Sequence, residues 1–138
     1  VMMTRVNGGQ PGGTDDHGDL VGDGLALGAL WDELGRANVA SWREAGLQGD
    51  RAYFYGTFPA AAAAISNLGE VLLHSWDLAQ ATGRGYVIDP DLAALVYGLY
   101  SAVPLDDKRA KGVLGPEVTM PADAPVADRV LALLGRRP

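Results

Sequence analysis

The sequence predicts an all-α fold in which the helices pack as a bundle. Apolar residues recur at helical spacing in four segments, at about residues 25–45, 59–83, 89–104 and 123–135. A glycine or proline stands at or just beyond the end of each segment, where such residues commonly stop a helix. The pieces between are short, and three of them favour extended connectors, at residues 51–58, 86–88 and 116–120. Because 138 residues is the length of one ordinary domain, a single helical bundle is the simplest architecture.

The N-terminal part of the chain is expected to stand apart from that bundle. The chain opens with VMMTRV, which is typical of the last turn of a helix. Residues 7–24 are dense in glycine and aspartate, a composition that favours a loop. We therefore divide the chain into residues 1–24, a Gly/Asp-rich loop with a helix stub, and residues 25–138, the helical domain. The first helix of that domain carries an apolar stripe formed by Leu27, Leu30, Trp31, Leu34 and Trp42, and Gly46 is expected to end it.

The segment from Pro59 to Gly83 is the longest predicted helix, and the rest of the chain is expected to pack against it. Pro59 suits the first helical position, and Gly83 suits a left-handed stop. At about 100° per residue, apolar side chains cover most of its circumference, and the polar ones share one narrow sector. That sector contains Asn67, Glu70, His74 and Asp77. Because little of the helix surface is left for water, we expect the polar sector to point inward or into a cleft.

Two further helices are predicted after the central one. Asp89 and Pro90 suit the cap and the first residue of a helix that ends before Pro104. Residues 105–121 are polar and then extended. Asp123 is expected to cap the last helix, and Gly135 to close it.

Composition excludes several classes of function. The net charge of −6 argues against a surface for nucleic acid or for an anionic membrane. The chain has no cysteine, so it has no thiolate nucleophile, and any metal has to be held by nitrogen and oxygen. The first residues contain no continuous apolar run, which predicts neither a signal peptide nor a membrane span. The expected location is therefore cytoplasmic.

Glu70 and His74 carry the sharpest chemical hypothesis in the sequence. They lie one helical turn apart, so a carboxylate and an imidazole can reach the same metal ion. An intrahelical hydrogen bond or a satisfied core pair explains the same spacing. Asp77 is expected either to orient the imidazole of a metal-bound His74 or to bond a neighbouring backbone group. His17, the other histidine, is either a further ligand or an exposed loop residue.

Two stretches of the sequence resemble a known family. The first is EVLLHSWDLAQATG, from Glu70 to Gly83, and the second is MPADAPVADRVLALLGRRP, from Met120 to Pro138. Together they resemble the actinobacterial branch of the DinB-like superfamily, which includes the mycothiol-dependent maleylpyruvate isomerases and their metal-binding relatives. The resemblance extends from about Leu25 to the C-terminus.

This resemblance implies a four-helix bundle with a divalent metal ion, commonly zinc or nickel, between its helices. The implied ligands are Glu70, His74 and a histidine on a helix that precedes the matching region. The stub VMMTRV corresponds to the end of that earlier helix, so the resemblance implies a partial DinB-like bundle that lacks the N-terminal helices and their histidine.

Three classes of function follow from these residues and from the resemblance. The first is a metal-dependent enzyme, a mycothiol-dependent isomerase or thiol transferase, in which the ion activates a small thiol to attack an electrophilic substrate. The second is a metal-binding or ligand-binding module without turnover. The third is a truncated bundle stabilised as a homodimer, because the loss of helices uncovers an apolar face. In each case the expected partners are small molecules or a second copy of the chain.

Overall fold

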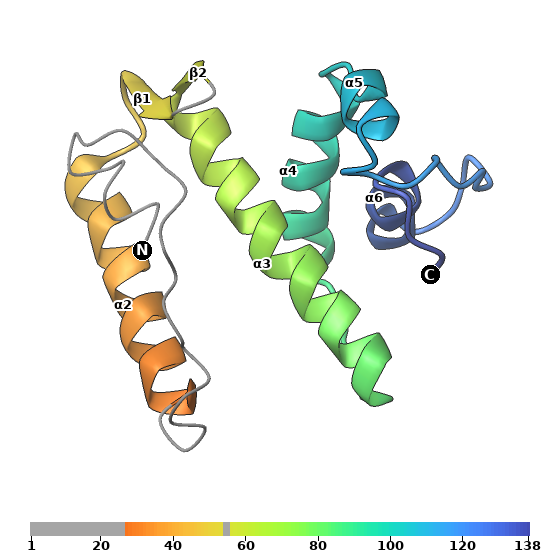
Figure 1. Cartoon of the computed structure of the whole chain (residues 1–138), viewed down its shortest axis with the longest axis horizontal. Coiled ribbons are helices and arrows are strands. Elements are labelled where there is room, and N and C mark those ends of the chain that lie inside the picture. The colour runs from red at the N-terminus through yellow and green to blue at the C-terminus, as the bar shows by residue number, and fades with distance from the viewer. Residues whose placement is uncertain (1–26, 54–55) are drawn as a thin grey trace. The chain divides into compact units, whose positions relative to one another are not determined.

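The computed structural model describes residues 27–53 and 56–138 (Figure 1). The chain divides into two compact units, residues 1–64 and residues 65–138. The described residues form five helices and one two-stranded sheet, so the prediction of a mainly α-helical class is confirmed. The predicted stub and loop of residues 1–24 lie outside the described residues. None of the helices described here has the length and apolar character needed to cross a membrane.

Helix α2, Leu27–Ala45, belongs to the first unit. It ends where the sequence predicts, because Gly46 adopts a φ of 67° and its N–H donates to the Trp42 carbonyl at 2.9 Å. The side chain of Arg51 then caps the helix, donating to the carbonyls of Ala45 at 3.1 Å and Gly46 at 2.8 Å. A guanidinium at this place satisfies carbonyls that have no helical partner.

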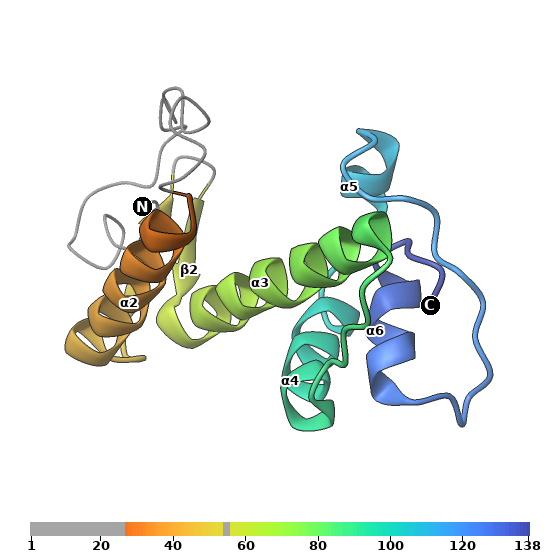
Figure 2. The ribbon, with the colours of Figure 1, turned by 90° about the horizontal axis from the view of Figure 1, so that it is seen from below.

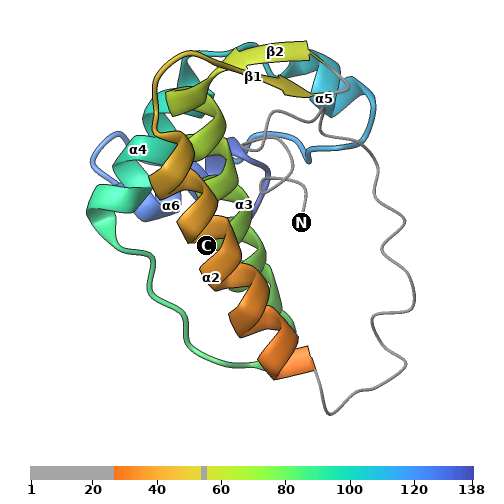
Figure 3. The same ribbon diagram turned by 90° about the vertical axis from the view of Figure 1, so that its left-hand side faces the viewer.

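A β-hairpin occupies the region predicted to be extended. Strand β1, Asp50–Tyr53, pairs antiparallel with strand β2, Gly56–Pro59 (Figure 3). Pro59 lies opposite Asp50 as the last residue of β2, and so the prediction that it opens the next helix is wrong by one residue. The helix starts at Ala60, whose N–H donates to the Gly49 carbonyl at 2.8 Å.

Helices α3, Ala60–Thr82, and α4, Pro90–Ser101, begin and end close to the predicted residues. Gly83 stops α3 with a φ of 66°, as expected. The carboxylate of Asp89 caps α4 by accepting hydrogen bonds from the N–H groups of Asp91 at 2.9 Å and Leu92 at 3.1 Å. Local signals of this kind act within a few residues, which is why they can be recognised from sequence.

The C-terminal part differs from the prediction in two ways. A short helix α5, Asp106–Ala110, lies in the stretch expected to be polar and irregular, because five residues are too few to show a helical pattern. Helix α6, Val126–Leu133, begins after Pro125, so the prediction that Asp123 caps it is wrong. The physical reason is Pro125, which disfavours a helical conformation for the residue before it and so blocks extension towards Asp123.

The core of the second unit lies between α3, α4 and α6 (Figure 2). Its buried members are Leu72, Leu73, Ile88, Ala93, Val96, Leu105, Val130, Leu131 and Leu134. Gly69 lets α3 approach α4 closely, because a Cβ at this position would lie 3.2 Å from the ring of Tyr100 and 3.3 Å from Val96. This close approach brings Tyr100 next to the polar residues of α3.

Candidate functional site

Three of the predicted polar residues of α3 lie in contact with one another. His74 stands in the middle, with its Nε2 atom 3.2 Å from Oε2 of Glu70 and its Nδ1 atom 3.2 Å from Oδ2 of Asp77. A neutral imidazole has a single N–H, so it can donate to only one of these two carboxylates at a time. The other ring nitrogen is then an acceptor, and it is the atom at which a metal ion can bind.

The sequence predicts that this row points inward or into a cleft. The inward alternative is wrong, whereas Glu70 and His74 do line a cavity at the surface. The His74 side chain is 67% exposed and that of Glu70 is 60% exposed. The inward side of α3 is occupied by Leu72, Leu73 and Ala79 instead. Burying these apolar side chains is favourable, whereas burying a carboxylate or a charged imidazole carries a large desolvation cost. The helix therefore turns its polar row to the edge of the second unit.

Asp77 connects the row to the C-terminal segment. The guanidinium of Arg136 donates to both of its carboxylate oxygens, from Nη2 to Oδ2 at 2.8 Å and from Nε to Oδ1 at 3.1 Å. These hydrogen bonds hold the pKa of Asp77 below its usual value, against the opposing effect of burial, and His74 adds to the lowering. Asp77 is thus ionised, and it is placed both to accept from His74 and to anchor Arg136.

Arg136 reaches Asp77 because two backbones touch just before it. Gly135 has a φ of 82°, and a Cβ built on it would lie 2.7 Å from the Cα of Gly115. The N–H of Arg136 donates to the Leu131 carbonyl at 2.8 Å, which fixes the turn after α6. The sequence prediction did not assign Arg136 to the site. The only available signal was its place in the closing G-R-R-P stretch, 59 residues away from Asp77.

A cavity of about 140 Å³ opens beside Glu70 and His74. Lys108 and Arg136 line it with positive charge, and Tyr100 lines it with a phenol. Its remaining lining residues are apolar, namely Leu73, Val113, Leu114 and Leu134. The sequence analysis did not predict Lys108 or Tyr100, which no local motif connects to His74.

Tyr100 is a largely buried titratable group at this site. Burial raises the pKa of its phenol, partly offset by a hydrogen-bond contact of 3.3 Å between its hydroxyl and Oγ of Ser66. The hydroxyl therefore stays protonated at neutral pH and is available as a hydrogen-bond donor.

The donor set fits a divalent ion in part. Glu70 and His74 supply one oxygen and one nitrogen, the ligand types that zinc and nickel accept where no thiolate is present. Within residues 27–53 and 56–138, no group of three or more His, Cys, Asp and Glu side chains is arranged to hold an ion. His17 lies outside the described residues. A bound ion therefore needs ligands beyond this pair.

Comparisons with known proteins identify two relatives, both from Mycobacterium tuberculosis. They are named Uncharacterized protein MT0763 and Uncharacterized protein Rv0738, and each is 41% identical to this chain over 70 residues, or 49% of its length. The match covers 37% of each relative, so the chain spans little more than a third of their length. No family model matches the sequence. No solved structure matches it either.

Proposed function

We propose that Glu70 and His74 hold one divalent metal ion, zinc or nickel, and that this ion serves a mycothiol-dependent isomerase or thiol transferase of the DinB-like kind. The 3.2 Å separation between Oε2 of Glu70 and Nε2 of His74 is the observation that carries the proposal. Two ligands of one tetrahedral zinc ion stand about 3.3 Å apart, given zinc–ligand distances of about 2.0 to 2.1 Å. The two side chains thus need little movement to share an ion.

The contact of His74 with Asp77 supports the same proposal from the other side of the ring. Histidines that bind metal commonly donate their second N–H to a carboxylate, which fixes the ring and raises its basicity. Asp77 lies 3.2 Å from Nδ1 and is itself fixed by Arg136. The exposure of Glu70 and His74 leaves room for further ligands, such as water and the thiol.

The ion would lower the pKa of a bound thiol, so that the thiolate is available at neutral pH. The residues around it have roles of their own in this proposal. Lys108 and Arg136 line the neighbouring cavity and favour an anionic thiol or substrate, and protonated Tyr100 offers a hydrogen bond in the same cavity. A cavity of about 140 Å³ admits only a small group, so most of a larger thiol would remain outside it.

Metal affinity tests the proposal directly. The chelator-treated chain should bind about one equivalent of zinc or nickel by calorimetry or by competition with a chromogenic chelator. His74→Ala should weaken that binding by more than about 100-fold, beyond the loss typical of removing an outer hydrogen-bond partner. His17→Ala is the control and should leave the affinity much closer to that of the wild type. Equal losses in the two variants would show that the ligand assignment is wrong.

A non-catalytic metal-binding role uses the same pair of ligands, so a turnover assay is needed to separate the two. Metal-loaded protein should consume mycothiol or glutathione in the presence of an electrophilic substrate, and His74→Ala should not. Stoichiometric metal binding without consumption of thiol would favour the binding module over the enzyme.

A further inference from the structure

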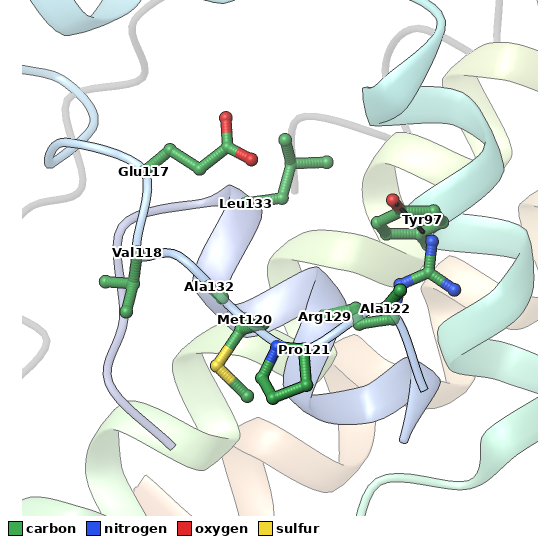
Figure 4. A pocket seen from close by; sticks show the side chains of 9 residues that line it. All are labelled: Tyr97, Glu117, Val118, Met120, Pro121, Ala122, Arg129, Ala132 and Leu133. Atoms are coloured by element: carbon green, nitrogen blue, oxygen red, sulfur yellow. Dashed lines mark hydrogen bonds between the residues drawn. The ribbon is translucent and has the colours of Figure 1, made fainter. Parts of the chain in front are cut away.

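A second pocket, of about 180 Å³, lies in the same unit and shares no lining residue with the first (Figure 4). It is formed by α4, by α6 and by the irregular segment of residues 116–122. The N–H of Val118 donates to the Ala132 carbonyl at 3.0 Å, which holds this segment against α6. Tyr97 and Arg129 form one side of the pocket, and Glu117 stands on the other side in the view of Figure 4.

Arg129 is held in a fixed position at this pocket. Its Nη2 donates to the hydroxyl of Tyr97 at 2.8 Å, and its guanidinium carbon lies 4.4 Å from the centre of the Tyr97 ring. A guanidinium has five N–H donors, and among the described residues Arg129 uses its side chain in no other hydrogen bond. The remaining donors form a planar array already oriented by stacking. Such an array suits the two oxygens of a carboxylate.

Glu117 gives the pocket an opposite charge at its other end. Its side chain is 61% exposed and forms an ion pair with Arg109, whose Nη2 lies 3.6 Å from Oε2, too far for a hydrogen bond. An exposed ion pair of this kind is weak, so the carboxylate can still attract a second cation. A simple anion drawn to Arg129 would also meet the negative charge of Glu117. A ligand with a positive group at its far end would meet attraction at both ends instead.

The size of the pocket limits the ligand to a small molecule. A cavity of about 150 Å³ accommodates benzene. The pocket here is of similar volume, at about 180 Å³. Most of the surface exposed in the pocket is polar, and Met120, Pro121 and Leu133 supply a small apolar part that a short hydrocarbon spacer can contact. A small molecule that carries two opposite charges can place one on Arg129 and the other towards Glu117.

We propose that this pocket binds a small zwitterion of the amino-acid class, with its carboxylate on Arg129 and its ammonium group on Glu117. The proposal does not depend on the metal site, because it uses none of Glu70, His74 or Asp77.

The test is a titration of the whole chain followed by NMR, with chelator present so that no metal site contributes. The probes are ω-amino acids from glycine to 6-aminohexanoate, each compared with the carboxylate of the same chain length that lacks the amine. One length should produce saturable shifts in residues 117–122 and 129–133 and in the Arg129 side chain, with a Kd at least about tenfold lower than that of its amine-free partner. No saturable shift at about 20 mM of any probe, or equal binding of the paired probes, would overturn the proposal.

Variants assign the two ends of the ligand. Arg129→Gln should weaken binding of the best probe at least about tenfold, whereas Arg137→Gln, which removes the same charge from an exposed arginine, should leave it unchanged. Glu117→Gln should abolish the preference for the amine-bearing probe while leaving the weaker carboxylate binding intact. Arg129 also joins α6 to Tyr97, so Arg129→Gln can fail to fold for a structural reason. In that case the titration of Glu117→Gln decides whether the proposal holds. Retention of the amine preference in that exposed variant would refute the assignment.

Discussion

Glu70 and Asp77 contact the same imidazole from opposite sides, yet they are anchored very differently. Asp77 is 37% exposed and receives two hydrogen bonds from Arg136, which is itself only 20% exposed. Glu70 is 60% exposed, and among the described residues its side chain has His74 as its single hydrogen-bond or ion-pair partner. The difference separates two tasks: the Asp77 side ties His74 to the fold, and the Glu70 side leaves a carboxylate free to change partner.

This asymmetry suits a site that has to orient a ring and still accept a ligand. A bidentate pair between a carboxylate and a guanidinium is strong and geometrically specific, particularly where both groups are partly buried. An exposed pair between a histidine and a carboxylate contributes little, because water and salt screen it. Stability should therefore depend on the Asp77 side, and metal binding on the Glu70 side.

The largest expected effect comes from breaking the turn that delivers Arg136 to Asp77. Gly135→Ala places a Cβ 2.7 Å from the backbone of Gly115 and imposes a φ of 82° on a residue that disfavours it. The combined clash and strain should lower the free energy of unfolding by about 3 kcal/mol, measured by chemical denaturation.

Gly85→Ala is the matched control for this substitution. Gly85 has open space at its Cβ position and no left-handed φ, so the change should be nearly neutral. Similar losses at the two glycines would mean that the contact between Gly115 and Gly135 has no special role.

A smaller effect is expected from Asp77→Asn, and it should depend on pH. The pKa of Asp77 in the fold lies below its ordinary value of 3.8, so its ionised form stabilises the protein. This stabilisation is fully present when the pH is above the ordinary pKa of an aspartate. It is lost as the pH falls through the lower pKa that Asp77 has in the folded protein. At pH 7 the variant should lose about 1 to 2 kcal/mol, since hydrogen bonds to a charged group are weakened but not all removed.

The difference between the wild type and Asp77→Asn should narrow as the pH is lowered below about 4. Denaturation curves at pH 7 and at acid pH measure it. Asp123→Asn alters an exposed carboxylate that makes no hydrogen bond or ion pair with the described residues, so its stability at pH 7 should stay close to that of the wild type. A difference for Asp77→Asn that stays constant with pH would contradict the role given to Arg136.

The ends of the helices could be predicted from the sequence because each depends on neighbouring residues. Gly46, Gly83 and the pair Asp89–Pro90 act within one turn of the chain, and the structure places helix ends at all three. The prediction that Asp123 caps α6 fails because a neighbouring residue, Pro125, sets the start of that helix. The spacing that brings Glu70, His74 and Asp77 together is equally local, so their proximity could also be predicted from the sequence.

The direction of the polar row and its link to the C-terminus could not be predicted in this way. Helix α3 is apolar on several sides, and only its packing with α4 and α6 decides which of those sides is buried. Arg136 meets Asp77 across 59 residues, and the contact requires two glycine backbones to touch. Neither fact leaves a periodic signal in the sequence. The cavity beside His74, with Lys108 and Tyr100, depends on the same long-range packing.

The smallest expected change in stability, Glu70→Gln, gives the sharpest test of the asymmetry. In metal-free protein the exposed contact with His74 contributes little, so the free energy of unfolding should change by less than about 0.5 kcal/mol. Metal affinity should nevertheless fall by more than about tenfold, because an amide oxygen is a weaker ligand than a carboxylate. Glu117→Gln, at another exposed carboxylate, should change neither quantity much. A large loss of stability in metal-free Glu70→Gln would show that Glu70, like Asp77, stabilises the fold. Unchanged metal affinity would show that Glu70 is not a metal ligand.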